Sequence, residues 1–329
     1  MAQSSLLNLA VICGGYSAEA PVSLKSAANV MEHLDRSRYQ PTLIHIDQQE
    51  WWAEVSEERR LVNRGDFTVP GLPPFDGVLI MVHGTPGEDG RLQGYFELLG
   101  MPHTTGDARN MALTFHKGWT TALLRAKGHP VAPSTQVAQG TDLSSLDLEA
   151  LLVGIGLPCF VKPNEGGSSV GVHRVDTLDQ LLPAIQAALE VEHSSVLVEG
   201  FMSGREFTVG VIPDGKGGLE ALPVTEIISH NLFFDYAAKY EGASDEITPA
   251  DLPMAIAEHM QQLSLAVYRD LDCRGMARVD MIVMDDIPRI IEINTVPGFS
   301  KASIVPQQGA AIGISKQEIL TRVIEATIR

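Results

Sequence analysis

Short apolar runs of strand length alternate with segments of helical period along most of this chain. An apolar run at 6–13 ends at Gly14-Gly15, and apolar positions then recur at helical spacing over 24–34. Two further apolar runs, 43–46 and 77–82, have the length of buried strands. Strands that alternate with helices in this way are typical of α/β proteins, so the sequence predicts an α/β fold.

The length of 329 residues predicts two or three domains, because a single hydrophobic core seldom serves so long a chain. Residues 1–106 are expected to form a doubly wound, Rossmann-like domain. A change of pattern at Asp107 begins a second domain, 107–198, and residues 199–329 form a third. The elements expected in the last two domains are strands at 159–163, 196–199, 207–212, 279–284 and 289–294, a helix at 253–271 and a long loop at 229–250.

Charge and composition exclude several classes of protein. The formal net charge of −17 argues against a nucleic-acid partner, because such binding needs a basic face. A small anionic ligand remains compatible, since it needs only a local cluster of cations. No apolar stretch approaches the ~20 residues of a membrane span, and the N-terminus lacks the basic segment of a signal peptide. Cys13, Cys159 and Cys273 have no metal-type spacing, so we expect buried free thiols and a cytoplasmic location.

Two strands near the C-terminus carry the most informative pattern. Alternate side chains of a strand share a face, so Arg278 and Asp280 point one way, and Glu292 and Asn294 share a face of the next strand. The short connection at 285–288 favours a hairpin, and a register with Asp280 opposite Glu292 would gather three oxygen donors. Mg²⁺ prefers such ligands, so a metal site is predicted there. The alternative is a solvated polar face, but both strands are apolar on their other face.

A glycine-rich loop at 166–171 follows Lys162 at the end of a strand. Its small residues expose backbone N–H groups that could bind phosphate oxygens. The spacing matches neither a P-loop nor a dinucleotide fingerprint, and by itself the loop could be an ordinary turn. The preceding lysine favours a loop that covers a triphosphate. Gly14-Gly15 with Glu19 could be simple helix capping, and 83–90 could be a polar turn or a ligand loop at the edge of a sheet.

Taken in order, these stretches resemble the D-alanine–D-alanine ligase family of the ATP-grasp superfamily. The resemblance runs from Gly14 to about Gly313, which is nearly the whole chain. The segments that carry it are 15–23, 83–94, 161–171, 199–206, 233–240, 278–280, 292–295 and 297–303. The chain departs from the usual family residues at Ala20-Pro21, Gly200, Phe234 and Phe299.

The resemblance implies an ATP-grasp fold that binds ATP and two Mg²⁺ or Mn²⁺ ions. It implies that the enzyme, a homodimer, joins two D-alanine molecules through an acyl phosphate for peptidoglycan synthesis. The catalytic residues it implies are Glu19, Ser168, Tyr240, Arg278 and Gly298. The substrate contacts it implies are Glu19, His83, Lys239, Arg278, Ser303 and Ile304. The ATP contacts it implies are Lys117, Lys162, Gly167, Ser168, Glu199, Gly200, Phe201, Met202, Glu206 and Lys239. The metal ligands it implies are Asp280, Glu292 and Asn294.

Three alternatives stay open at this stage. The same chemistry could use D-lactate or D-serine as the second substrate, although in the family a tyrosine such as Tyr240 favours an amine. A nucleotide-binding paralogue without activity should have lost one of the residues Arg278, Asp280, Glu292 or Asn294, and all four are present. A dinucleotide-dependent oxidoreductase should carry a G-x-G-x-x-G turn after the first strand, and this chain has none there.

Overall fold

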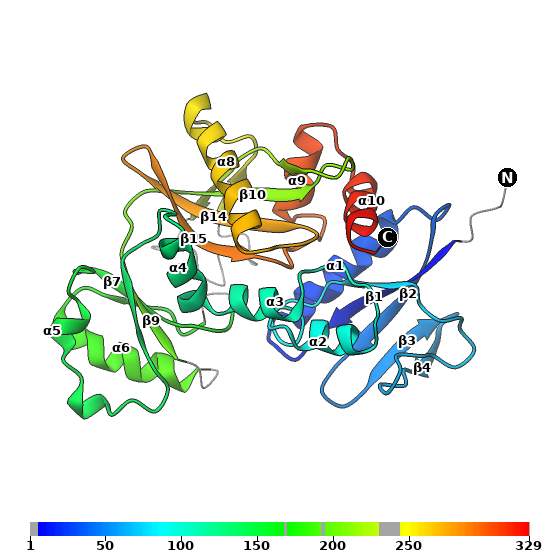
Figure 1. Cartoon of the computed structure of the whole chain (residues 1–329), viewed down its shortest axis with the longest axis horizontal. Helices are drawn as coiled ribbons and strands as arrows, with labels where there is room; N and C mark the ends of the chain where they lie inside the picture. The colour runs from blue at the N-terminus through cyan, green and yellow to red at the C-terminus, as the bar shows by residue number, and fades with distance from the viewer. Residues whose placement is uncertain (1–5, 168–169, 192–194, 230–243, 329) are drawn as a thin grey trace.

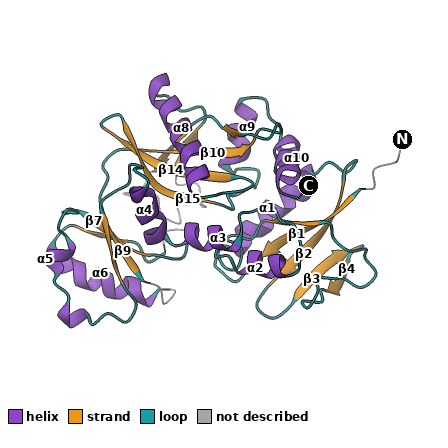
Figure 2. Cartoon of the chain, in the orientation of Figure 1, coloured by secondary structure: helices purple, strands orange, loops and turns teal. Residues whose placement is uncertain are grey.

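A computed structural model describes residues 6–167, 170–191, 195–229 and 244–328. Within these residues the chain forms three β-sheets with helices packed on them (Figures 1 and 2). Each sheet is built from its own stretch of the sequence, and the first and second lie at opposite ends of the view in Figure 1. This arrangement confirms the predicted α/β class.

The first sheet has the strand order β4-β3-β2-β1-β5. Its elements are β1 (Leu7–Gly14), α1 (Ala20–His33), β2 (Tyr39–Ile46), β3 (Trp51–Val55), β4 (Glu58–Leu61), β5 (Gly77–Ile80) and α2 (Arg91–Leu98). Strand β1 pairs in parallel with both β2 and β5, as in a doubly wound domain. Alternate residues of β1 face opposite sides: Leu9 and Val11 pack with α1, whereas Ala10 and Ile12 pack with α2.

The antiparallel hairpin β3–β4 was absent from the sequence prediction. Its strands mix charged with apolar residues, and the two-residue connection Ser56-Glu57 contains no glycine. Both residues nevertheless adopt positive φ angles of 50° and 68°, the backbone that tight hairpins require. The hairpin extends the first sheet at its edge, so the domain is only partly parallel.

The second sheet is antiparallel throughout, with the order β6-β9-β7-β8. Its strands are β6 (Ser134–Val137), β7 (Cys159–Pro163), β8 (His173–Val175) and β9 (Val196–Gly200), and its helices are α5 (Leu148–Leu151) and α6 (Leu178–Glu190), with a 3-10 turn at Leu143–Ser145. Helices α3 (Ala108–Phe115) and α4 (Lys117–Ala126) connect it to the first sheet. The predicted boundary after residue 198 falls inside β9, which pairs with β7 up to Gly200. We therefore propose that this lobe ends between Gly200 and Arg205.

The third sheet has the order β13-β12-β10-β14-β15, and β11 pairs with β10. Its elements are β10 (Arg205–Pro213), β11 (Leu219–Ala221), β12 (Thr225–Ser229), β13 (Ser244–Ile247), α8 (Met254–Asp270), β14 (Ala277–Met284), β15 (Ile287–Asn294), α9 (Ile304–Ala311) and α10 (Lys316–Thr327). The predicted loop at 229–250 is wrong in part, because Ser244–Ile247 pairs with β12 as a strand. Residues 230–243 lie outside the described residues.

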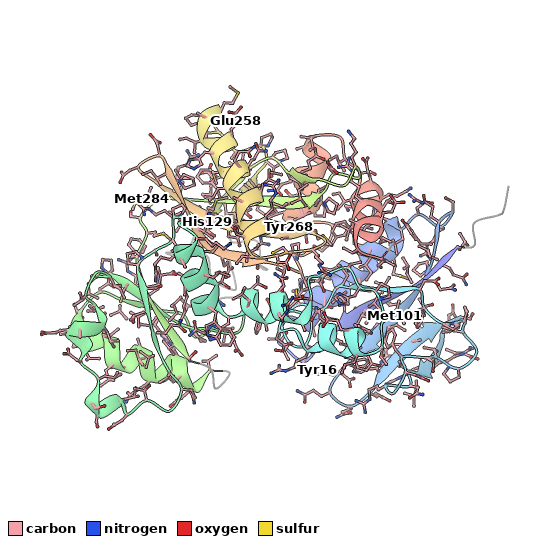
Figure 3. The ribbon with its side chains drawn as sticks, in the orientation of Figure 1. Tyr16, Met101, His129, Glu258, Tyr268 and Met284 are labelled. Carbon is pink, nitrogen blue, oxygen red and sulfur yellow. The ribbon has the colours of Figure 1, made fainter. Side chains whose placement is uncertain are left out.

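The first and third sheets share one hydrophobic core. Leu9 and Val11 of β1 belong to the same buried cluster as Ile319 and Val323 of α10. The second sheet has its own core, formed mainly between α6 and strands β7 and β9. The segment after α4 also contacts the part of the chain that carries the third sheet. His129, labelled in Figure 3, has its Nε2 atom 2.7 Å from Asp270 Oδ2 at the end of α8. The first and third sheets are therefore joined to each other through a shared core, whereas the second sheet has a core of its own.

Helix α2 offers a matched test of the core on the side of the first sheet where Ala10 and Ile12 pack. Phe96 is fully buried, and its ring makes an edge contact with Phe67 at a centroid distance of 4.9 Å. Replacing Phe96 with alanine is expected to lower the free energy of unfolding by about 3–5 kcal/mol, because it leaves a cavity. Leu98 in the same helix is 90% exposed, and its replacement with alanine should change stability by less than about 0.5 kcal/mol. Urea unfolding of the two variants checks this, and equal losses would contradict the packing described here.

The three cysteines are buried and free, as predicted. Burial raises the pKa of Cys13 to about 12, that of Cys159 to about 11 and that of Cys273 to about 12. These groups stay protonated at neutral pH and are therefore unreactive as nucleophiles. Among the described helices, none is long and apolar enough to cross a membrane.

Candidate active site

A cavity of about 1170 Å³ lies between the three sheets, and all predicted site residues that the structure describes line it. They come from segments that are far apart in the sequence: Glu19, His83, Lys117, Lys162, Gly167, Glu199, Gly200, Phe201, Met202, Glu206, Arg278, Asp280, Glu292, Asn294, Gly298, Ser303 and Ile304. Ser168, Lys239 and Tyr240 lie outside the described residues. The fold therefore brings together what the sequence separates, and the role of each residue remains a prediction.

The hairpin β14–β15 has the register that the sequence predicted. Asp280 lies opposite Glu292, and Arg278 lies opposite Asn294. The strands are joined by Asp285 and Asp286, whose φ angles of 54° and 61° fit a two-residue hairpin turn. A bulge directly after Asp280 shifts the pairing of the residues that follow. It leaves the polar face of the hairpin intact.

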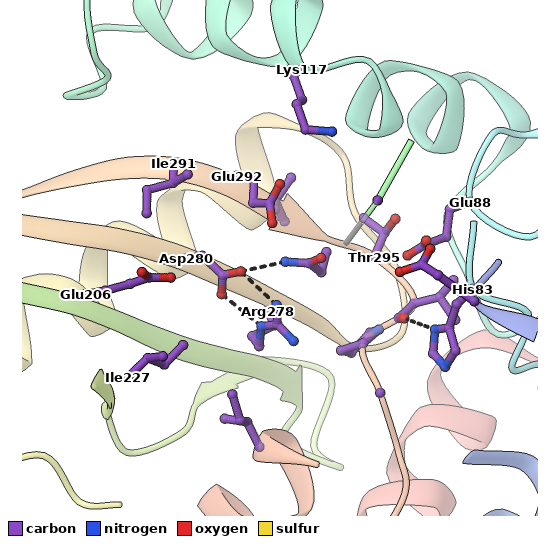
Figure 4. Close-up of a pocket in the computed structure, with 18 of the residues that line it drawn as sticks. His83, Glu88, Lys117, Glu206, Ile227, Arg278, Asp280, Ile291, Glu292 and Thr295 are labelled. Atoms are coloured by element: carbon purple, nitrogen blue, oxygen red, sulfur yellow. Dashed lines mark hydrogen bonds and ion pairs between the residues drawn. The ribbon is translucent and has the colours of Figure 1, made fainter. Parts of the chain in front are cut away.

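Asp280 is fixed by three neighbours, and its bonds to Arg278 are drawn in Figure 4. Its carboxylate accepts two hydrogen bonds from the Arg278 guanidinium, of 2.8 and 2.7 Å. It accepts a third from the Asn294 amide at 2.9 Å and a fourth from the Thr208 hydroxyl at 2.5 Å. Thr208 had no place in the sequence prediction, because it is a buried polar residue in an otherwise apolar strand. The arrangement holds the carboxylate rigidly at the cavity wall.

The donor chemistry of this hairpin fits Mg²⁺ or Mn²⁺. Since the Asn294 nitrogen points to Asp280, the amide oxygen remains available to a cation. Glu292 also faces the cavity, on the wall opposite Lys117 (Figure 4). Across the described parts of the chain, no three His, Cys, Asp or Glu side chains form a metal-binding group. The site would therefore rely on Asn294 and on oxygens of a bound ligand, as is usual for Mg²⁺ bound with a nucleotide.

Two lysines face the same cavity from the second lobe. Lys162 Nζ forms a buried ion pair with Glu199 Oε2 at 2.7 Å. Lys117 Nζ donates a hydrogen bond of 2.8 Å to the Gly166 carbonyl in the glycine-rich loop. Lys162 and Glu199 were predicted to bind different parts of ATP, and the structure brings them into direct contact. Their pairing fixes the position of the Lys162 ammonium group at the cavity wall.

Asn164 connects these lysine-bearing segments and was missed by the sequence analysis. Its side-chain oxygen accepts from the Gly118 N–H at 2.8 Å, and its carbonyl accepts from the Lys117 N–H at 2.9 Å. Its side-chain nitrogen donates to Ser195 Oγ at 2.8 Å. An asparagine directly after the Lys162-Pro163 pair was visible in the sequence, but these partners lie 31 to 47 residues away (164 − 117 = 47 for Lys117).

Glu19 and Glu88 form an acidic wall on the side of the first sheet. A Cβ built at Gly167 would lie only 2.6 Å from Glu19 Oε2, so the glycine-rich loop approaches this carboxylate closely. Burial, and secondarily the charge of Glu19, raises the pKa of Glu88 to about 8. Glu88 lies in the predicted 83–90 loop but received no role there. Its carboxyl accepts from the Gly84 N–H at 2.7 Å, which holds that loop in shape.

His83 lies at the cavity wall, but both of its ring nitrogens have partners inside the protein. Nδ1 lies 2.9 Å from the Val296 carbonyl, and Nε2 lies 3.0 Å from Ser26 Oγ. Burial lowers the pKa of His83, with the charge of Arg278 acting in the same direction. Both ring nitrogens are thus already bonded within the protein, whereas the sequence predicted a contact of His83 with a substrate carboxylate. A role in shaping the loop at 296–299 fits the geometry better.

The N-terminus of α9 forms another part of the cavity wall. Ser303 occupies the N-cap position of this helix, without a side-chain capping hydrogen bond, and Ile304 begins it. The backbone N–H groups at such an end favour a carboxylate. A Cβ built at Gly298 would lie 2.9 Å from Ser303 Oγ, so the loop needs a glycine or a shift of the serine at this point. This end of the cavity suits a small acidic ligand.

Comparison with known proteins assigns the chain to a family. Residues 123–325 match the family model "D-ala D-ala ligase C-terminus", and residues 8–70 match "D-ala D-ala ligase N-terminus". The chain belongs to the D-alanine–D-alanine ligase family. It is therefore a ligase of the ATP-grasp type, which confirms the resemblance found in the sequence and the predicted fold.

Relatives of this ligase cover nearly its whole length. It is 39% identical to the D-alanine–D-alanine ligase of Flavobacterium johnsoniae over 98% of this chain and 99% of the relative. It is 41% identical to that of Porphyromonas gingivalis W83 over 96% of each chain.

Solved structures show the same fold. The ligase of Coxiella burnetii has a TM-score of 0.87 at 29% identity and covers 99% of this chain and 94% of its own. The VanG D-Ala:D-Ser ligase of Enterococcus faecalis also has a TM-score of 0.87, at 30% identity, and covers 98% of this chain and 99% of its own.

Proposed function

We propose that this ligase uses ATP to join two D-alanine molecules to D-alanyl-D-alanine, a precursor for peptidoglycan, and releases ADP and phosphate. One observation carries the proposal: a single cavity holds two lysines, a hairpin with carboxylates and an arginine, and a helix N-terminus. These are the groups needed to hold a polyphosphate, a reacting carboxyl and a second amino acid.

In the proposed complex, ATP lies between the second and third sheets. Lys117 and Lys162 neutralise phosphate charge, and Gly167 and Ser168 belong to the glycine-rich loop that we propose to cover the phosphates. Glu199, Gly200, Phe201 and Met202 form the wall that receives adenine, and Glu206 accepts hydrogen bonds from the ribose hydroxyls. Asp280, Glu292 and Asn294 would hold two Mg²⁺ or Mn²⁺ ions, which supply charge neutralisation at the transferring phosphoryl group.

The first D-alanine is proposed to bind with its ammonium near Glu19. Its carboxylate oxygen attacks the γ-phosphorus and ADP leaves, which gives an acyl phosphate. The second D-alanine binds with its carboxylate at Ser303 and Ile304, and its amine, after losing a proton, attacks the acyl carbon. Arg278 and the Gly298 N–H stabilise the oxyanion of the tetrahedral intermediate, from which phosphate leaves. We propose that Tyr240 closes the site by hydrogen bonding near Glu19 and Ser168, which excludes water, and that Lys239 contacts the substrate and ATP.

A second candidate differs only in the second substrate. One structural relative is a D-Ala:D-Ser ligase, and a D-serine side chain exceeds that of D-alanine by one hydroxyl. An apolar pocket rejects an added hydroxyl only weakly. The experiment offers ATP and D-alanine alone, then with D-serine or D-lactate, and identifies products by mass spectrometry. D-Alanyl-D-alanine as the main product supports the proposal, whereas a mixed product favoured at equal concentrations would refute the assigned acceptor.

We also propose that the enzyme acts as a cytoplasmic homodimer. The three free, buried thiols suit a reducing compartment. Analytical ultracentrifugation of the full chain would show twice the mass of 35.5 kDa. A single species at the monomer mass across micromolar concentrations would contradict the dimer.

A further inference from the structure

A buried chain of hydrogen bonds bridges the two ends of the loop Val296–Phe299. The Phe299 N–H donates to Ser26 Oγ at 3.1 Å. Ser26 Oγ lies 3.0 Å from His83 Nε2, and His83 Nδ1 lies 2.9 Å from the Val296 carbonyl. All the side chains in this chain are buried. The middle of the bridged loop is Gly298, which lines the cavity.

The direction of each hydrogen bond in this chain is fixed by its end groups. The Val296 carbonyl can only accept, so His83 must carry its proton on Nδ1. Because the Phe299 N–H can only donate, Ser26 Oγ accepts there and keeps its own proton for Nε2 of the neutral imidazole. The low pKa of His83 that burial causes agrees with a neutral ring. Ser26 and His83 thus form one continuous chain of hydrogen bonds between the two ends of the loop.

Asn29 holds the same end of the loop by a further hydrogen bond. Asn29 Nδ2 donates a 2.6 Å hydrogen bond to the Phe299 carbonyl, and Asn29 Oδ1 accepts one from Lys316 at 3.1 Å. Helix α1 therefore holds both the N–H and the carbonyl of Phe299. With Val296 held through His83, little freedom remains for Pro297 and Gly298 between them.

We propose that Ser26 is a positioning residue that fixes the Gly298 N–H for oxyanion stabilisation by holding Phe299 and, through His83, Val296. This rests on the proposed function, in which the Gly298 amide faces the tetrahedral intermediate. A preorganised donor stabilises a transition state without reorganising during the reaction, so a loosened loop costs rate more than ATP affinity.

Ser23 provides a matched control for Ser26. It lies one turn earlier in α1 and is also fully buried. It likewise makes two hydrogen bonds, accepting from the Gly14 N–H at 2.9 Å and donating to the Met81 carbonyl at 2.6 Å. Neither partner belongs to the loop at 296–299. Ser23→Ala and Ser26→Ala therefore each remove one buried hydroxyl group from α1. Of these two hydroxyl groups, the one of Ser26 bonds to the loop at 296–299 and the one of Ser23 does not.

The first measurement is amide hydrogen exchange at Phe299 in protein labelled with ¹⁵N-phenylalanine. Ser26→Ala is expected to speed exchange of this amide by roughly 10-fold or more relative to wild type, since its acceptor is lost. Ser23→Ala should leave the exchange of Phe299 within about two-fold of wild type. This measurement needs no substrate, so it stands even if the proposed reaction is wrong. Unchanged exchange in Ser26→Ala would overturn the proposal.

The second measurement separates positioning from folding by steady-state kinetics. Ser26→Ala is expected to lower kcat by roughly 10- to 100-fold with the KM for ATP changed less than about two-fold. His83→Gln keeps a donor and an acceptor and should retain more activity than His83→Phe, which has neither. A Ser26→Ala enzyme with normal kcat but fast Phe299 exchange would refute the catalytic part, as would equal loss in the two His83 variants. If the wild-type enzyme forms no dipeptide, the proposed function fails. The exchange measurement still shows whether Ser26 holds Phe299 in place.

Discussion

Replacing Asp280 with asparagine is expected to lower kcat for D-alanine-dependent phosphate release by about 10²–10³-fold. The change removes one negative charge from the proposed metal site and weakens the carboxylate contacts that orient Arg278, while the side-chain volume stays nearly constant. Both losses act on the charge that develops during phosphoryl and acyl transfer. A coupled assay for phosphate, run with and without D-alanine, measures the effect.

Asp286 in the turn of the same hairpin supplies the matched control. Asp286→Asn removes the same charge from the same hairpin, but at an exposed position in the turn, and asparagine tolerates the positive φ of 61°. We expect its kcat to stay within about two-fold of wild type, since exposed charges contribute little. Higher Mg²⁺ should partly restore Asp280→Asn and leave Asp286→Asn unchanged. If the two variants lose activity equally, Asp280 has no special role in the site.

Replacing Lys162 with methionine is expected to lower both the free energy of unfolding and the use of ATP. The ion pair with Glu199 is buried, so removing the lysine leaves an uncompensated carboxylate in the interior, at a cost of about 3–5 kcal/mol. The same change removes a positive charge proposed to contact ATP phosphates, so the KM for ATP should rise. Urea unfolding and the ATP dependence of phosphate release measure the two effects separately.

The double variant Lys162→Met with Glu199→Gln distinguishes these two roles. It removes both charges, and replacement of a whole buried ion pair is often nearly neutral for stability. We therefore expect stability to return to within about 1–2 kcal/mol of wild type, while the KM for ATP remains high. Lys216→Met, at an exposed turn, should change neither quantity. Recovery of ATP use together with stability would show that Lys162 acts only through the fold.

The hairpin β14–β15 illustrates what local sequence can predict. Its two strands are adjacent in the chain and joined by two residues, so the period of two in the pattern leaves few registers that put Asp280, Glu292 and Asn294 on one face. The structure has that register. The β3–β4 hairpin and strand β13 lack such a clear alternation, and both were missed. Their pairing is stabilised by the edge of a sheet that already exists, which local patterns do not encode.

The sequence by itself determined the α/β class, the hairpin of Asp280 and Glu292, and the family, because these depend on short-range patterns and on motifs in a fixed order. Only the tertiary structure decided that Lys162 pairs with Glu199 and that Thr208 donates a hydrogen bond to Asp280. It also decided that Ser26 accepts a hydrogen bond from Phe299, 273 residues away in the sequence. Such contacts depend on how three sheets pack around one cavity, and no local spacing specifies which distant polar groups will meet once they are buried.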